Sequence, residues 1–267
     1  MFTSSGVHIF LVGALSVGAL FLVSWGIHLI LKNAAVVDVT WGLGFILLSV
    51  VYLLQGKGFN LRNSIYLLMI SLWGIRIAWY LIKRMALEKQ EDRRYKKIRQ
   101  SFGKMAWFKF LFIFEFQALL QMIIGLPFMI VSLNPFSGVS ACEVAGAVVF
   151  AFALIGEAVS DEQLRAFKRN PNNKGKTCDT GLWYYSRHPN YFFEWLLWTG
   201  IFIYALGSPL GWVAFVSPLV MYFLLMYVSG VPLAEEQSLL SRGDEYRKYQ
   251  ATTSVFFPMF KKRIETL

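Results

Sequence analysis

Long apolar runs dominate this chain and restrict the folds that it can form. Several exceed the ~20 residues that a helix needs to span a bilayer, and 56% of the residues are hydrophobic whereas 16% are charged. Backbone groups inside a bilayer must bond within a helix or a closed barrel, and these runs lack the alternation of barrel strands. The sequence therefore predicts membrane-spanning helices. We place seven spans, at about 7–31, 36–55, 63–85, 107–132, 142–161, 191–207 and 210–228.

Lys and Arg fall almost entirely on one side of this arrangement. With seven spans, 23 of the 26 lie on the side of the C-terminus, only Lys57 and Arg62 lie opposite, and Arg76 lies within the third span. Positively charged loops stay in the cytoplasm. We therefore expect an all-α integral membrane protein, a seven-transmembrane helix bundle with its N-terminus outside and its C-terminus in the cytoplasm. The whole chain, 1–267, is expected to form a single transmembrane domain, with 229–267 as a cytoplasmic tail that packs on the bundle.

The same charge pattern excludes other function classes. Topology explains most of the net charge of +10, and the basic residues flank spans without forming a nucleic-acid reading motif. The two cysteines, Cys142 and Cys178, have no metal-site spacing and suggest no disulfide framework. We expect no nucleic-acid partner and no metal.

Polar side chains inside the predicted spans are the residues that most need a function. Such groups are costly in hydrocarbon and usually face a cavity or one another. The set is His28, Asp38, Arg76, Glu115, Gln117, Gln121, Glu157, Asp161, Asn190 and Glu194. Counting 1.5 Å per residue from flanking basic residues places Asp38, Arg76 and Glu115 roughly 9–10 Å inside the cytoplasmic half. This convergence predicts one polar cavity that opens to the cytoplasm, while for single residues snorkelling, capping or helix pairing stays an alternative.

A cationic segment follows the fifth predicted span. Arg165, Lys168 and Arg169 lie near one face of a helix that ends at Pro171, and a flexible turn containing Lys176 comes next. This segment is suited to cradle phosphates. No glycine-rich fingerprint follows a strand here, so a Rossmann module is not supported.

The stretch 186–195, SRHPNYFFEW, leads from this polar segment into the sixth predicted span. Asn190 and Glu194 are four residues apart and share one face of a helix. Together with 181–185 (GLWYY), 198–200 (WTG) and 244–246 (DEY), this stretch resembles the C-terminal half of steroid 5-alpha-reductase (3-oxo-5-alpha-steroid 4-dehydrogenase) membrane proteins. The segment 37–44, VDVTWGLG, resembles the second span of a bacterial branch of that superfamily, and this likeness covers nearly the whole chain.

The resemblance implies a seven-helix bundle in a bacterial inner membrane that binds NADPH from the cytoplasmic side. It also implies reduction of the carbon–carbon double bond of an enone, as in a 3-oxo-Δ4-steroid. Asp161, Asn190 and Glu194 match family positions that contact the cofactor. The full set of expected cofactor-binding residues is Arg76, Tyr80, Asp161, Arg165, Lys168, Lys176, Tyr185, Arg187, His188, Asn190, Glu194 and Tyr246.

The sequence departs from the family where the substrate binds. Family members have a tyrosine at the position of Trp73, and an indole N–H donates a hydrogen bond but cannot deliver a proton. Hydride addition leaves negative charge on the carbonyl oxygen, so another donor must point there. We expect this catalytic group to be Asp38 or Glu115, kept protonated by burial, or Tyr80. Trp41 and Trp73 are expected to contact the substrate, a steroid or sterol-like lipid.

Two other functions fit the same residues. The Arg187-His188-Pro189 motif and the pair Glu235-Glu236 also resemble isoprenylcysteine carboxyl methyltransferases, which use S-adenosylmethionine. The third interpretation is a lipid-binding membrane protein without catalytic activity, whose pocket holds a headgroup. In each case we expect a monomer surrounded by membrane lipids.

Overall fold

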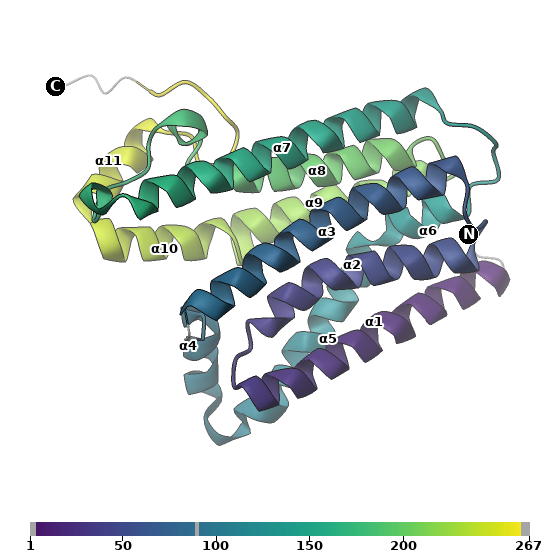
Figure 1. The fold of residues 1–267 in the computed structure, drawn as a ribbon, viewed down its shortest axis with the longest axis horizontal. Helices are drawn as coiled ribbons and strands as arrows, with labels where there is room; N and C mark the ends of the chain where they lie inside the picture. Colours follow the sequence, from purple (N-terminus) through teal and green to yellow (C-terminus); the bar gives the residue numbers. More distant parts are fainter. Residues whose placement is uncertain (1–3, 89–90, 263–267) are drawn as a thin grey trace. The chain divides into compact units, whose positions relative to one another are not determined.

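The computed structural model describes residues 4–88 and 91–262, and every regular element in this part is helical. The chain divides into two compact units (Figure 1). The first comprises residues 1–143 and 205–214, and the second comprises 144–204 and 215–267. The single domain over 1–267 stays a prediction, and the last residues of the expected tail, 263–267, lie outside the described residues.

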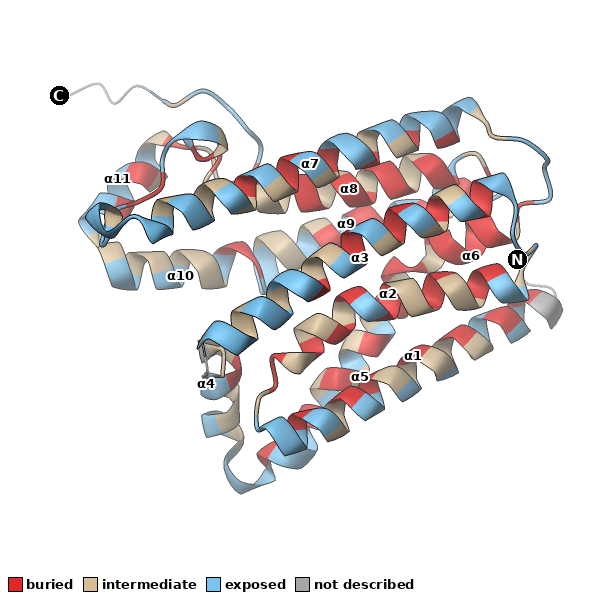
Figure 2. Cartoon of the chain, in the orientation of Figure 1, coloured by how far each residue is buried: buried red, intermediate tan, exposed pale blue. Residues whose placement is uncertain are grey.

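The first unit contains six helices among the described residues. They are α1 (Ser4–Leu31), α2 (Val36–Gln55), α3 (Leu61–Glu88), α4 (Arg93–Phe102), α5 (Ala106–Ile124) and α6 (Leu126–Ser132). Figure 1 shows α1, α2 and α3 side by side. The central helix is α2, which contacts α1, α3, α5 and α6. Figure 2 accordingly shows α2 with few exposed positions, whereas α1 is exposed along one side.

Two glycines let α2 take this central place. A Cβ on Gly42 would lie 2.8 Å from the carbonyl oxygen of Gly74 on α3, and a Cβ on Gly44 would overlap the side chain of Gln121 on α5. Small residues allow membrane helices to approach this closely. The amide nitrogen of Gln121 donates to the carbonyl of Trp41 at 2.7 Å, which joins α5 to α2 next to these contacts.

The second unit contains α7 (Ala141–Arg169), α8 (Pro189–Ala205), α9 (Val216–Phe223), α10 (Val231–Arg242) and α11 (Asp244–Thr252). Glycines again set a close contact, because a Cβ on Gly146 would lie 2.4 Å from the backbone nitrogen of Tyr204. Gly200 faces the backbone of Phe150 in the same way. The helices α7 and α8 therefore pack backbone to backbone within this unit.

Six helices in the described chain are long and apolar enough to cross a membrane. They span Gly6–Leu31, Val36–Gln55, Leu61–Leu87, Arg94–Ile124, Ala141–Arg169 and Gly211–Arg242. The sixth predicted span, 191–207, corresponds to α8, whose 17 residues reach about 26 Å, less than the ~30 Å hydrocarbon core. The fourth predicted span, 107–132, is interrupted at Gly125, between α5 and α6. Several apolar helices thus mark a multi-pass membrane protein, and the count of seven stays a prediction.

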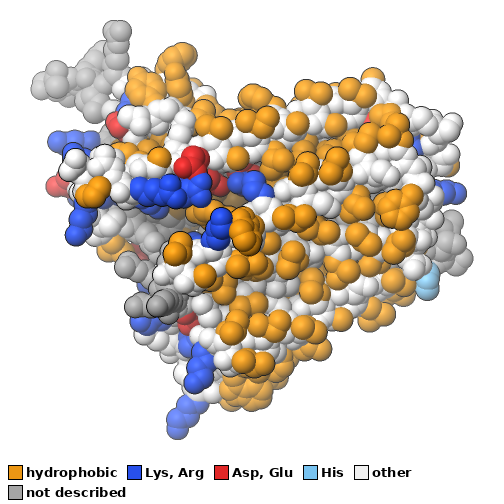
Figure 3. Space-filling view, viewed as in Figure 1, with side chains coloured by type: hydrophobic (Ala, Val, Ile, Leu, Met, Phe, Trp, Pro, Cys, Tyr) orange, Lys and Arg blue, Asp and Glu red, His pale blue; other side chains and the backbone are white. Residues whose placement is uncertain are grey.

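The outer surfaces of these helices are apolar. In the first unit, Leu15 and Ile30 on α1 and Ile75 on α3 are among the exposed large hydrophobic side chains. Figure 3 shows such side chains along the visible side of α3. Lipid tails are a suitable environment for a surface of this kind, whereas a soluble protein rarely exposes so large an apolar area.

One ion pair in the first unit is almost completely buried. Arg62 and Glu143 form a salt bridge with only 4% and 0% of their side-chain surfaces exposed. The remaining donors of Arg62 bond to the carbonyls of Phe136 and Gly138, and Glu143 also accepts from the backbone of Ser140. This network holds the loop before α7 against the start of α3.

Removal of Arg62 tests this network. Arg62→Ala leaves the carboxylate of Glu143 buried without its partner, and we expect a loss of about 3–5 kcal/mol in the free energy of unfolding. Denaturant unfolding in detergent micelles measures it. Replacing both residues by leucine removes the unpaired charge and should recover part of the loss; wild-type stability of the single variant would contradict the assignment.

Candidate functional site

The polar cluster predicted around Asn190 is present in the second unit. The side-chain nitrogen of Asn190, in the first turn of α8, lies 3.3 Å from Oδ1 of Asp161 on α7. Glu194 follows one turn later on α8 and is 8% exposed, and its Oε1 accepts from the indole N–H of Trp198 at 3.0 Å. Asp161, Asn190 and Glu194 thus belong to one pair of packed helices.

The start of α8 is fixed by a second, charged network. Arg187 donates through Nε to Oε1 of Glu235 at 2.7 Å, and His188 Nε2 lies 3.2 Å from the same oxygen. The other oxygen of Glu235 accepts from Gln250 at 2.8 Å. Arg187 also bonds to the backbone carbonyls of Gln250 and Thr253. The carboxylate of Glu235 therefore joins α8, α10 and α11, and its lone pairs are largely used within the protein.

The C-terminal segment packs on this network. The backbone nitrogens of Arg187 and Met259 donate to the carbonyls of Ser254 and Tyr185, at 2.8 and 2.9 Å. Tyr249 donates to the carbonyls of Trp183 and Ser186, both buried. The described part of the tail thus closes over the loop that precedes α8.

The other predicted cofactor residues of this unit differ in exposure. Arg165, Lys168 and Lys176 are exposed, and Arg165 pairs with Glu162. Tyr185 is exposed and packs edge-on against Tyr184 and Phe260. Tyr246 is buried, and burial raises the pKa of its phenol to about 12. The three cations are accessible to a ligand, whereas Tyr246 belongs to the packing between α10 and α11.

In the first unit, Asp38 is held by residues that the sequence did not single out. Its two carboxylate oxygens accept from Arg94 at 2.8 Å and from the hydroxyl of Tyr95 at 2.6 Å. Arg94 also bonds to Asp92. Both oxygens of the Asp38 carboxylate are therefore already engaged within the protein.

The other catalytic candidates lie apart from Asp38. Glu115 on α5 faces Gly18 of α1, where a Cβ would lie 3.6 Å from its carboxylate, and among the described residues it has no hydrogen bond or ion pair. Tyr80 on α3 is exposed. Among the described residues, the hydrogen bonds of Asp38 go to Arg94 and Tyr95 and not to Glu115.

The two predicted substrate residues, Trp41 and Trp73, both contact Phe45. The ring centroids lie 5.2 and 5.7 Å from that of Phe45, each in an edge-to-face arrangement. Trp73 is fully buried, whereas Trp41 is partly exposed. Trp73 therefore packs in the core between α2 and α3, and Trp41 is the better placed of the two to meet a ligand.

Comparison with known proteins agrees with this architecture. Residues 24–253 match the family described as "Protein of unknown function (DUF1295)". The chain belongs to this family. DUF1295 is part of the steroid 5-alpha-reductase-like superfamily, so the resemblance inferred from the sequence is confirmed at that level.

Two relatives of this DUF1295 protein come from fungi. An uncharacterized protein of Schizosaccharomyces pombe is 26% identical over 93% of this chain and 79% of its own length. A protein of Ustilaginoidea virens named as a probable O-methyltransferase is 46% identical, but over only 17% of this chain and 16% of its own. No solved structure matches. The expected restriction to a bacterial branch is thus not supported, because the similarity extends to fungi.

The sequence pattern did not identify the hydrogen-bond partners in the networks around Asp38 and Glu235. Arg94 and Tyr95 lie in a basic stretch whose charges are explained by topology, and their contact with Asp38 spans 56 and 57 residues. Glu235 was noted only for its likeness to methyltransferases. The one available signal is the acidic pair at 91–92 directly before the basic residues of 93–99, which predicts local ion pairs.

The pKa of His188 makes the second network sensitive to acid. Burial lowers the pKa of this imidazole from its usual 6.5, although the hydrogen bond with Glu235 acts in the opposite direction. The unfolded chain therefore takes up the proton more readily than the folded one, so protonation favours unfolding.

We expect the free energy of unfolding to decrease as the pH falls below about 6.5, the pKa of an unperturbed histidine. Thermal unfolding of the detergent-solubilised protein across this range measures the slope. His188→Asn keeps a side-chain donor but does not titrate, so its slope should be smaller. Identical slopes for both proteins would show that other groups cause the acid sensitivity.

Proposed function

We propose that this protein is a membrane-embedded, NADPH-dependent reductase of a steroid-like or other lipid enone. The observation that carries the proposal is the pairing of Asn190 with Asp161, one turn from the buried Glu194. Membership of the steroid 5-alpha-reductase-like superfamily adds support for an enzyme.

The Asn190 cluster fits a nicotinamide. The side-chain oxygen of Asn190 is buried and has no hydrogen-bond partner among the described residues. A buried acceptor without a donor is unfavourable by about 1–3 kcal/mol. The carboxamide of a nicotinamide has an NH2 group that can supply the missing donor, and its carbonyl can accept in turn. The residues present thus match the group that the family binds.

Other residues would hold the rest of the cofactor. NADPH supplies a hydride when bound, and the protein supplies position and charge. The accessible cations Arg165, Lys168 and Lys176 belong to the same unit as Asn190 and suit the phosphates. Arg187 and His188 act by orienting the first turn of α8, because Glu235 already binds both. Arg76 and Tyr80, on α3, are proposed for cofactor binding from the family resemblance alone.

The donor to the substrate carbonyl is proposed from Asp38, Glu115 and Tyr80. Both oxygens of Asp38 already accept from Arg94 and Tyr95, so this residue would act by orienting the Tyr95 hydroxyl. Glu115 has no such donors among the described residues, so it is the carboxyl group better suited to carry a proton.

The proposal includes a topology. We place α8 in the membrane as the sixth of seven spans, the N-terminus outside and the cofactor site at the cytoplasmic face; in a bacterium this is the inner membrane. The charge distribution of the sequence supports this orientation. A hydrophobic substrate would enter from the lipid, and a monomer suffices because both proposed sets of residues lie in one chain.

A second candidate function is methyl transfer from S-adenosylmethionine. The short similarity to a probable O-methyltransferase favours it, as does the Arg187–His188–Glu235 network. That network nevertheless has little capacity left for a ligand, because Glu235 already accepts from three side chains. We therefore place the reductase first.

Asn190→Ala tests the pairing of Asn190 with Asp161, the observation on which the proposal rests. Loss of the side-chain hydrogen bonds should weaken NADPH binding about tenfold, equivalent to roughly 1.4 kcal/mol. Gln237→Ala, at an exposed amide side chain on α10 of the same unit, is the matched control. Titration of the purified proteins with NADPH, followed by tryptophan fluorescence, gives both affinities. Equal affinities, or stabilisation against heat by S-adenosylmethionine and not by NADPH, would refute the proposal.

Asp38→Asn separates substrate chemistry from cofactor binding. Arg94 keeps its bonds to Asp92 in this variant, so the local fold should persist. If Asp38 serves the substrate carbonyl, turnover of a 3-oxo-Δ4-steroid should fall by about 10²-fold while NADPH affinity is unchanged. Following NADPH oxidation measures turnover. Equal losses in turnover and affinity would remove Asp38 from this role.

A further inference from the structure

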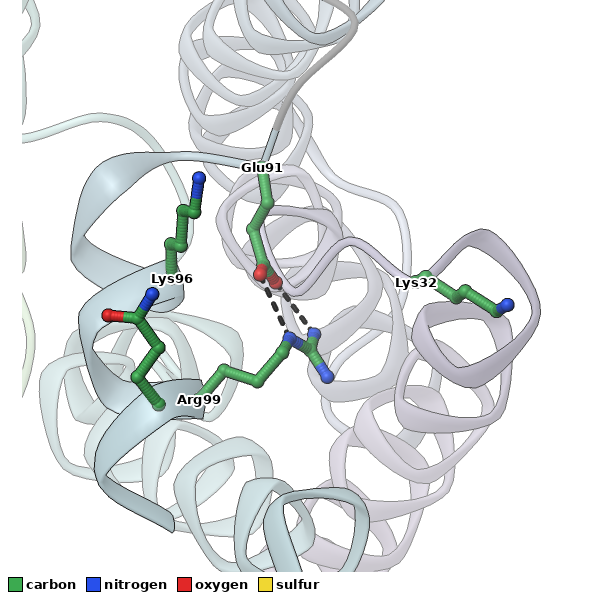
Figure 4. Close-up of a pocket in the computed structure, with 5 residues that line it drawn as sticks. Lys32, Glu91, Lys96 and Arg99 are labelled. Carbon is green, nitrogen blue, oxygen red and sulfur yellow. Dashed lines mark hydrogen bonds and ion pairs between the residues drawn. The ribbon is translucent and has the colours of Figure 1, made fainter. Parts of the chain in front are cut away.

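A charged cavity of about 520 Å³ lies in the first unit, lined by Lys32, Glu91, Lys96, Arg99 and Gln100. Figure 4 shows it between the C-terminal end of α1 and the helix α4. None of these five residues belongs to the proposed cofactor or substrate site. Its volume is within the range of small-molecule sites.

The centre of the cavity is an arginine that is already paired. Arg99 donates to both oxygens of Glu91, at 2.9 and 2.6 Å, and the backbone nitrogen of Ala34 donates to Glu91 as well. Burial raises the pKa of Glu91, but these donors outweigh it and the net pKa is lowered. Glu91 therefore stays ionised and fixes the guanidinium in the wall.

Unlike Arg99, the two lysines of the lining have no carboxylate partner among the described residues. Within the described chain, neither Lys32 nor Lys96 has an ion pair or a side-chain hydrogen bond, and both are exposed. In Figure 4 they lie on opposite sides of the Glu91–Arg99 pair, with the amino group of Lys32 directed away from it. Their flexible chains can turn toward an anion. Three cations with one carboxylate leave the cavity with excess positive charge.

The cavity borders a surface suited to lipid. Ile30 and Leu31, the last residues of α1, are 81% and 57% exposed, and Trp107 at the start of α5 is 52% exposed. The indole N–H of Trp25 donates to the carbonyl of Trp107 at 2.9 Å, which joins the ends of these two helices. Tryptophan is enriched at the level of the lipid headgroups. Positive charge next to exposed apolar side chains matches a phosphate attached to acyl chains.

We propose that the cavity of Lys32, Lys96 and Arg99 binds the phosphate of an anionic phospholipid, with the acyl chains on the exposed ends of α1 and α5. This site does not depend on the proposed reaction. A phospholipid bound here tethers α4, which carries the partners of Asp38, to the end of α1.

The backbone of Lys32 offers an unusually clean variant. Lys32 ends α1 with φ of 52°, a left-handed conformation that glycine adopts without strain and other residues adopt at a cost. Lys32→Gly therefore removes the cation while relieving the backbone. Its thermal stability should equal or exceed that of the wild type, so weaker lipid binding by this variant cannot be attributed to unfolding.

Binding of short-chain phosphatidic acid in neutral detergent micelles, measured by native mass spectrometry, tests the proposal. We expect Lys32→Gly and Lys96→Ala each to weaken binding about fivefold. Lys57→Ala, an exposed lysine beyond the other end of α2, should have no effect. Glu91→Gln removes the only carboxylate of the lining, so it should tighten binding instead.

The second part of the experiment measures binding of inorganic pyrophosphate, which has phosphate groups but no acyl chains. Binding of the lipid but not of pyrophosphate at equal concentration supports a lipid site. Lysine-dependent binding of pyrophosphate without lipid binding would overturn it in favour of a soluble phosphate. Unchanged lipid affinity in both lysine variants would overturn the site altogether.

Discussion

A charged side chain in apolar surroundings is tolerated only when an opposite charge or several hydrogen bonds meet it, and this constraint shapes both units. Three ion pairs, among the described residues, join buried or half-buried partners from distant parts of the chain: Arg62–Glu143, Arg94–Asp38 and Arg187–Glu235. Their partners are 81, 56 and 48 residues apart. Each pair thus fixes how two or more helices meet, where apolar packing alone would allow them to slide.

The candidate site depends on the last of these pairs. Glu235 holds Arg187 and His188 at the entrance of α8, and the tail closes over them. The first turn of α8 is then fixed, which sets the positions of Asn190 and Glu194. Rigid placement of this kind is what a bound cofactor requires, because a small displacement of its reactive ring is costly for the reaction. In the proposed reductase, the charged network would therefore position the start of α8 and the amide cluster would bind the cofactor.

The sequence predicts the helices better than it predicts their partners. Apolar length locates the spans, and the spacing of Asn190 and Glu194 correctly predicts a shared polar helix face. By contrast, Arg94 lies between two predicted spans, in a basic segment whose charges already have an explanation in topology, so nothing local assigns it to Asp38. Trp73 was expected to meet the substrate but is fully buried, because aromatic residues in a span suit a packed core as well as a pocket. Contacts over long sequence separations and the depth of a side chain are set by tertiary packing, which a residue pattern does not encode.

Unused hydrogen-bonding capacity then separates structural polar groups from ligand-binding ones. Asp38 and Glu235 each accept from two or more donors, so a ligand would have to displace existing bonds. The buried oxygen of Asn190 has no donor in the described chain, and Lys32 and Lys96 have no counterion there. A buried polar group without a hydrogen-bond partner destabilises the folded protein unless a ligand supplies that partner. The amide of Asn190 in the second unit is suited to a carboxamide, and the two lysines in the first unit are suited to a phosphate.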